Sequence, residues 1–278
     1  MSYLNLKYID LSSITIVGSL IFFIWGIIVG LLLFIYFAIN GNFDTLSLLI
    51  PFTIAFISLV GGIVYYFIGT FIYNIFSKKI FNVSFEISNG NIKRISILPI
   101  SIIITLINII FVILFYPGLK LVLEVILIDL YSFISFTPMI SLIGQTIDII
   151  TNPIIILIFI VLTFILTVLG EFIYDLVSKK TGGVEIKLEN NNNNNGLNKI
   201  NYFKPSSVGL NLAISLIIPY TIINLIISFL FFPVSYINFI WVIIGGFIGI
   251  FIIMSISTIF YNLIANKLNP ILVELESN

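Results

Sequence analysis

The chain of 278 residues contains no cysteine and no histidine. Without cysteine it can form no disulfide, use no thiol nucleophile and bind no metal through sulfur. Without histidine it lacks the commonest general base and metal ligand at neutral pH. These absences argue against an enzyme, and we expect no cofactor and no bound metal.

Charge is scarce as well. Charged residues make up 9% of the chain and hydrophobic residues 60%, and the mean hydropathy is +1.22. A soluble domain carries roughly 25% charged residues, so this chain has too little polar surface to dissolve in water. The net charge is zero and by itself says nothing about nucleic acid, but nucleic acid is not an expected partner because no dense basic patch is interleaved with aromatics.

Long apolar runs are what the sequence does contain. Each of them approaches or exceeds the ~20 residues that cross a bilayer core. We interpret them as six transmembrane helices, over residues 12–39, 48–76, 99–117, 151–177, 206–232 and 236–264. Residues 118–150 are apolar but interrupted by charge and proline, which favours an extracytoplasmic amphipathic segment over a seventh and eighth span.

The basic residues are placed asymmetrically along this arrangement. Eleven of the twelve Lys and Arg residues fall on one side of it, and Lys120 is the exception. Because basic segments are retained in the cytoplasm, we expect a multi-pass protein of the cell membrane with both termini cytoplasmic. Several lysines at span ends would set the topology and bind anionic lipid headgroups: Lys78, Lys79, Lys179, Lys180 and Lys267.

Three span ends share one pattern, which reads FIYNIFSKKIFNVSFEI, FIYDLVSKKTGGVEIKL and IFYNLIANKLNPILVEL. Each copy has a tyrosine, then Asn or Asp, a lysine six residues after the tyrosine, helix breakers, and finally apolar residues with period two. The agreement predicts an internal repeat. The units would be residues 1–90, 91–196 and 197–278.

The period-two segments predict strands on the cytoplasmic side. Asn89-Gly90 between two such segments is a strong hairpin signal, and a second hairpin would span the asparagine run at 190–195. The last strand would have the N-terminal segment, residues 3–9, as its partner. The expected fold is therefore six transmembrane helices in three two-helix repeats, joined by short cytoplasmic β-hairpins and strands. We expect the serines at Ser12-Ser13, Ser101 and Ser206-Ser207 to cap the first helix of each unit.

The second unit, with IKRISILPISIII at its start and FIYDLVSKKTGGVEIKLE at its end, resembles an uncharacterised two-span transmembrane family of actinobacteria and archaea. Members of that domain-of-unknown-function family begin with a short basic strand and a Pro/Ser helix start. They end in Tyr-Asn-Leu, Gly-Gly and a strand. The resemblance covers residues 92–189 and is weaker in the other two units. It implies the architecture and supplies no catalytic residues, since the family has no established activity.

Polar residues near the span ends are the candidate site. Asn74, Asp175 and Asn262 follow the three tyrosines and would either lock helix to strand or form a polar ring around a path. Glu171 stands where the other copies have Thr70 and Thr258; it is either an interface-level carboxylate or a proton or cation site. Three tyrosines are expected as interface aromatics: Tyr73, Tyr174 and Tyr261.

Two function classes follow. The first is a non-enzymatic structural, regulatory or scaffolding membrane protein whose cytoplasmic β layer binds a partner, with sheet edges open to strand addition. The alternative is a small-solute or ion transporter or channel with a path along the three-repeat axis. Expected partners are membrane lipids and an unidentified membrane or cytoplasmic protein. Close helix packing is expected at the Gly26/Gly30 and Gly245/Gly249 pairs.

Overall fold

The computed structural model describes residues 2–39, 45–114, 152–190, 196–230, 236–268 and 270–277. Strands and helices alternate in a regular order. The strands are β1 (Ser2–Ile9), β2 (Val83–Ser88), β3 (Asn91–Ile95), β4 (Val184–Asn190), β5 (Leu197–Phe203) and β6 (Ile271–Ser277). The helices are α1 (Leu11–Ile39), the short η1 (Thr45–Leu49), α2 (Ile50–Lys79), an unlabelled helix over Ile97–Leu114, α5 (Pro153–Thr181), α6 (Pro205–Leu230) and α7 (Tyr236–Lys267). The interpreted segment at 118–150 lies outside the described residues.

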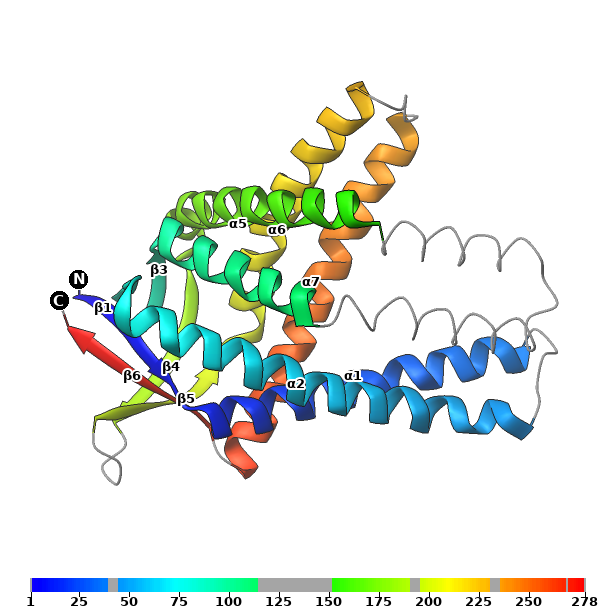
Figure 1. The fold of residues 1–278 in the computed structure, drawn as a ribbon, viewed down its shortest axis with the longest axis horizontal. Helices are drawn as coiled ribbons and strands as arrows, with labels where there is room; N and C mark the ends of the chain where they lie inside the picture. Colours follow the sequence, from blue (N-terminus) through cyan, green and yellow to red (C-terminus); the bar gives the residue numbers. More distant parts are fainter. Residues whose placement is uncertain are drawn as a thin grey trace.

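The strands form a small antiparallel barrel at one end of the molecule (Figure 1). Each strand pairs with its neighbours in the order β1-β2-β3-β4-β5-β6, and β6 returns to β1. The predicted partnership of the last strand with the N-terminal segment is confirmed, with Leu6 opposite Leu275. The expectation of open sheet edges is wrong, because the six strands close on themselves and each edge already has a partner.

Local turn chemistry explains the strand boundaries. Asn89 and Gly90 have φ values of 54° and 73°, the left-handed pair that closes the tight β2–β3 hairpin. Gly182, at φ 90°, ends α5 and donates its N–H to the carbonyl of Ser178. The predicted serine caps are wrong. Asp10 caps α1 by accepting the N–H of Ser13 at 2.7 Å, and Ser101 lies buried inside its helix.

Six helices are long and apolar enough to cross a membrane. They extend away from the barrel, with α1 and α2 running side by side and α6 and α7 forming a second, steeply tilted pair (Figure 1). At Gly26 an added Cβ would lie 2.8 Å from the Cα of Ala55, so this glycine allows the close α1–α2 approach, as predicted. The prediction fails for Gly245 and Gly249, whose Cβ positions face open space.

The core lies where the barrel meets the helices. Three buried clusters fill this region, and each contains one of the three repeated tyrosines. Tyr73 packs with Val83, Tyr174 with Val184, and Tyr261 with the start of β6. The barrel is thus packed onto the helix ends through these aromatic rings.

Candidate functional site: the junction of barrel and helices

Three tyrosines bind the barrel strands through their hydroxyl groups. All three rings are at most 8% exposed, so they are not the exposed interface aromatics that the sequence suggested. Each hydroxyl donates to a strand carbonyl: Tyr73 to Leu6 (2.9 Å), Tyr174 to Ile92 (2.6 Å) and Tyr261 to Ile200. Burial of the rings therefore depends on these bonds, because a buried phenol needs a partner.

The residue after each tyrosine contacts the same strand three residues further on. Asn262 forms a two-way pair with Phe203: it accepts the backbone N–H at 3.0 Å and donates to the carbonyl at 2.7 Å. Asn74 makes the same pair with Ile9, at 2.9 Å and 2.8 Å. These are the contacts of a helix–strand lock. None of the three side chains of the predicted polar ring lines the central cavity described below.

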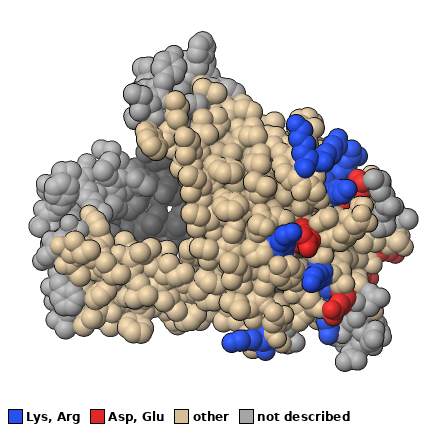
Figure 2. All heavy atoms as spheres, turned by 180° about the vertical axis from the view of Figure 1, so that it is seen from behind, with Lys and Arg blue, Asp and Glu red and all other residues tan. Residues whose placement is uncertain are grey.

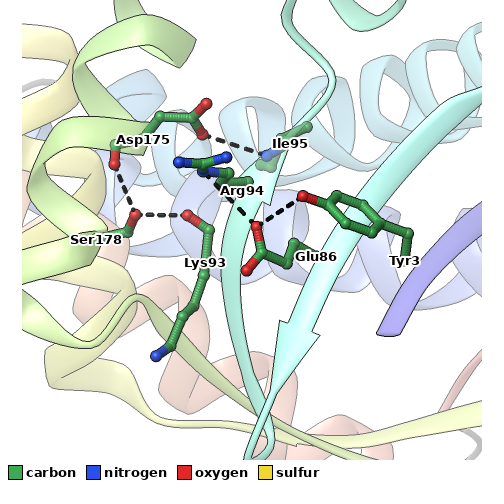
Figure 3. Close-up of polar contacts among 7 residues, drawn as sticks. All are labelled: Tyr3, Glu86, Lys93, Arg94, Ile95, Asp175 and Ser178. Atoms are coloured by element: carbon green, nitrogen blue, oxygen red, sulfur yellow. Dashed lines mark hydrogen bonds and ion pairs between the residues drawn. The ribbon is translucent and has the colours of Figure 1, made fainter. Parts of the chain in front are cut away.

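Asp175 differs because a carboxylate has no amide donor. Its Oδ1 accepts the N–H of Ile95 at 3.3 Å, which is half of the amide pair. Its charged neighbours lie toward β3 and β2 instead (Figure 3). Arg94 lies next to Asp175 and pairs with Glu86 at 3.6 Å, and Glu86 also accepts a hydrogen bond from Tyr3 at 3.3 Å. The second junction thus continues into a row of polar groups across β3, β2 and β1.

Glu171 lies one turn before Asp175 on α5 and borders a side cavity of about 470 Å³. Its Oε2 is buried and has no hydrogen-bond partner. Residues of α5, α6, α7 and the Ile97–Leu114 helix line this side cavity, mostly with aliphatic side chains. The buried Oε2 faces this cavity, and whether Glu171 is an interface-level carboxylate or a proton or cation site stays a prediction.

A central cavity of about 380 Å³ lies under the barrel, between helices of all three predicted units. Its walls are mainly aliphatic and aromatic, and the polar side chains among its lining are tyrosine, serine and threonine, for example Tyr66 and Thr258. No charged residue lines it within the described part of the chain.

Lys and Arg side chains gather at the barrel end, and the surface of the helices is almost free of charge (Figure 2). The span-end lysines with described side chains, Lys78, Lys179, Lys180 and Lys267, are all exposed there. Lys79 ends α2, but its side chain is outside the described part. Several charges on the barrel are paired, for example Lys204 with Glu185 at 2.9 Å. The hydrogen bond to Glu185 raises the pKa of Lys204 above its ordinary value.

Comparison with known proteins gives no match to a protein family, a curated protein or a solved structure. The resemblance of the second unit to a two-span family therefore stays a prediction. Within the described ranges, no three Asp or Glu residues are grouped so that they could hold a metal ion. What this junction does has to be inferred from its own contacts.

Two further junction residues were not singled out from the sequence. Ser77 and Ser178 follow their tyrosines by four residues and donate to the carbonyls of Lys7 (2.9 Å) and Lys93 (2.5 Å). Both serines are almost completely buried. A serine four residues after the tyrosine occurs in two of the three aligned copies, and the third copy has Ala265 at that position.

Proposed function

We propose that the chain is a non-catalytic, multi-pass membrane protein that presents the barrel at the cytoplasmic surface as a docking platform. In this role it is a structural, regulatory or scaffolding component. The observation that carries the proposal is the junction itself, where buried tyrosine and asparagine side chains bond the strands to the helix ends. A platform attached this rigidly would keep a bound partner at a fixed position relative to the bilayer.

The membrane placement is part of the proposal. Eleven of the twelve basic residues belong to barrel strands, their connections or the adjoining helix ends. With the barrel in the cytoplasm, this distribution obeys the retention of positive charge on that side. The exposed lysines around the barrel would then contact anionic headgroups, which makes membrane lipids a partner.

The second part of the proposal is a threefold internal repeat. In each predicted unit, the two strand residues bound by the helix are three apart: Leu6 and Ile9, Ile92 and Ile95, Ile200 and Phe203. If one two-helix unit occurs three times, the same spacing is expected in all three places. We therefore propose that residues 1–90, 91–196 and 197–278 are copies of one ancestral unit.

Partner docking would use the outer face of the barrel. Strand addition is ruled out as the mode, since closure leaves the six strands no free edge. The face carries exposed side chains in charged and aromatic pairs, such as Lys187 over the ring of Tyr202. Aromatic and charged groups of this kind suit a protein surface as the partner.

The axial transport path has less support. Its route would pass through the central cavity, whose walls offer hydroxyl groups but no charge among the described residues. A hydrophilic ion would lose its hydration there without a compensating carboxylate. The docking role needs no such path.

Orientation is tested first, using the absence of native cysteine. Single cysteines at Lys199 on β5 and at Leu49, the far end of the α1–α2 pair, are treated with a membrane-impermeant maleimide in sealed vesicles of each orientation. We expect Lys199→Cys to react only from the cytoplasmic side and Leu49→Cys only from the opposite side. The reverse pattern would overturn the placement.

Docking is tested by photo-crosslinking in native membranes. A photoreactive phenylalanine at Tyr3 or Tyr202, on the barrel face, should give a discrete protein adduct, and the same residue at Leu32 on α1 should react with lipid only. The adduct should disappear when Lys187 and Lys199 are both changed to Glu. If barrel and helix positions give the same adducts, the docking role is wrong.

A further inference from the structure

Several polar groups beside Glu171 border the side cavity as hydrogen-bond acceptors. Two hydroxyl groups that border it use their protons elsewhere: Thr167 donates to the carbonyl of Thr163, and Ser215 donates to that of Asn211. Their remaining lone pairs can only accept. Together with the unpartnered Oε2 of Glu171, these groups place several acceptors at one site.

The backbone carbonyl of Ser215 is a further acceptor at this cavity. Pro219 lies inside α6, is fully buried, and has no N–H to give to the carbonyl of Ser215 one turn earlier. That carbonyl oxygen faces Gly170 on α5, where an added Cβ would lie 3.3 Å from it. Gly170, Ser215 and Pro219 all line the side cavity. Helices in a membrane tolerate such a freed carbonyl when a neighbouring group satisfies it.

The size of the cavity decides what kind of donor fits. A single water needs roughly 10–15 Å³ of the same kind of volume, and organic ligands occupy pockets of roughly 300–1,000 Å³. The side cavity, at about 470 Å³, is far larger than a bare ion requires. Ile and Leu side chains contribute to its lining, and Leu216 and Tyr220 at its border are also exposed on the outer helix surface. A molecule could therefore enter from the lipid.

We propose that the side cavity binds an amphiphilic amine. The ammonium group lies between the Glu171 carboxylate and the freed carbonyl of Ser215, and the hydrocarbon chain lies along the aliphatic wall. A cation with N–H donors meets the acceptors at Glu171 and Ser215, and an alkyl chain fits the remaining volume. This site does not depend on the docking role of the barrel.

The probe is radiolabelled dodecylamine, with the intact protein in lipid nanodiscs and empty nanodiscs as the background. We expect a saturable component of one amine per chain. Excess unlabelled dodecylamine should displace it, and dodecanol, which has the same chain but no charge, should not. Equal displacement by dodecanol would overturn the proposal, because the carboxylate would then play no part.

Variants locate the site. Glu171→Gln should weaken binding about tenfold or more, the effect of losing one hydrogen bond to a charged group. Pro219→Ala returns an N–H to the Ser215 carbonyl and should weaken binding severalfold. Asp175→Asn removes the neighbouring carboxylate outside the cavity and should leave binding unchanged. Elution volume and unfolding midpoint show whether each variant is folded.

Three further results would overturn the proposal. Unchanged binding to a folded Glu171→Gln variant would place the amine elsewhere. Weakening by Asp175→Asn as large as that by Glu171→Gln would mean that general negative charge, and not this site, attracts the amine. A lack of any saturable component above the empty nanodiscs would mean that only water or lipid fills the cavity.

Discussion

Asn74 and Ile9 are 65 residues apart in sequence and exchange two hydrogen bonds, of 2.9 Å and 2.8 Å. Asn74→Asp keeps the acceptor but replaces the donor with an oxygen that faces the Ile9 carbonyl. We expect the free energy of unfolding to fall by about 1–3 kcal/mol, the cost of a buried group left without its partner. Denaturant titration in mixed micelles measures it. Asn74→Asp as stable as the wild type would mean that the lock contributes nothing.

The reverse change is expected at the second junction. Asp175→Asn introduces the amide that the other two junctions already have, next to the backbone of Ile95. Stability should be equal to or above that of the wild type in the same titration. A loss of more than about 1 kcal/mol would instead show that the carboxylate stabilises the fold through Arg94, as a charge-assisted contact can.

Tyr174 connects two strands that have little pairing of their own. The β3–β4 ladder has two residue pairs, and the Tyr174 hydroxyl donates to Ile92 and accepts from the N–H of Val184. Tyr174→Phe should lower stability by about 1–3 kcal/mol and speed amide hydrogen exchange at Val184. Tyr65→Phe, on an exposed ring of α2, is the matched control and should change neither.

Two glycines in similar sequence patterns should respond differently to alanine. Gly26→Ala would place a Cβ 2.8 Å from the Cα of Ala55 and force α1 and α2 apart, at a cost of about 1–3 kcal/mol. Gly249→Ala meets nothing within 4 Å and should be neutral or stabilising by up to ~1 kcal/mol, since alanine is the better helix former. Equal effects in unfolding experiments would contradict the packing described for α1 and α2.

The exposed Lys204–Glu185 contact predicts a weak alkaline dependence. The hydrogen bond to Glu185 raises the pKa of Lys204 in the folded protein above 10.5. The contact therefore stabilises the fold fully below the unfolded pKa, and this stabilisation is lost as pH rises through the folded value. The difference in unfolding midpoint between the wild type and Lys204→Met should be constant at neutral pH and should shrink as the pH rises above the ordinary lysine pKa of about 10.4. A difference that persists there would show that the lysine acts through its alkyl chain.

Local features of the structure could be predicted from the sequence, but the closure of the six strands into a barrel could not. The Asn89-Gly90 hairpin needs two left-handed residues in succession, a requirement that few sequences meet, and it was predicted. The β1–β2 and β3–β4 pairings join strands separated by long helices, and no local pattern specifies them. The cap of α1 was misplaced because serine and aspartate are equally good caps, and only the backbone shows that Asp10 is in position.

The candidate site was also predicted only in part, because local patterns identify residues but not the distant segments that they contact. Repetition drew attention to Tyr73, Asn74 and their equivalents without showing what they contact. The side cavity could not be anticipated, because its lining comes from four helices and one of its acceptors depends on the effect of Pro219 on a carbonyl one turn away. Glu171 stood out as an acid among threonines, but its unpartnered oxygen depends on how α5 packs against α6.

The pairing of β1 with β6 also sets the order of folding. About 262 residues separate the end of β1 at Ile9 from the start of β6 at Ile271. At a synthesis rate of roughly 5–20 residues per second, this interval lasts about 13–50 s. During that time β1 can pair with β2, while its other edge has no strand beside it. The ribosome must therefore finish the last strand before the sheet can close, and a nascent chain stalled before Ile271 would expose a β-edge to its neighbours.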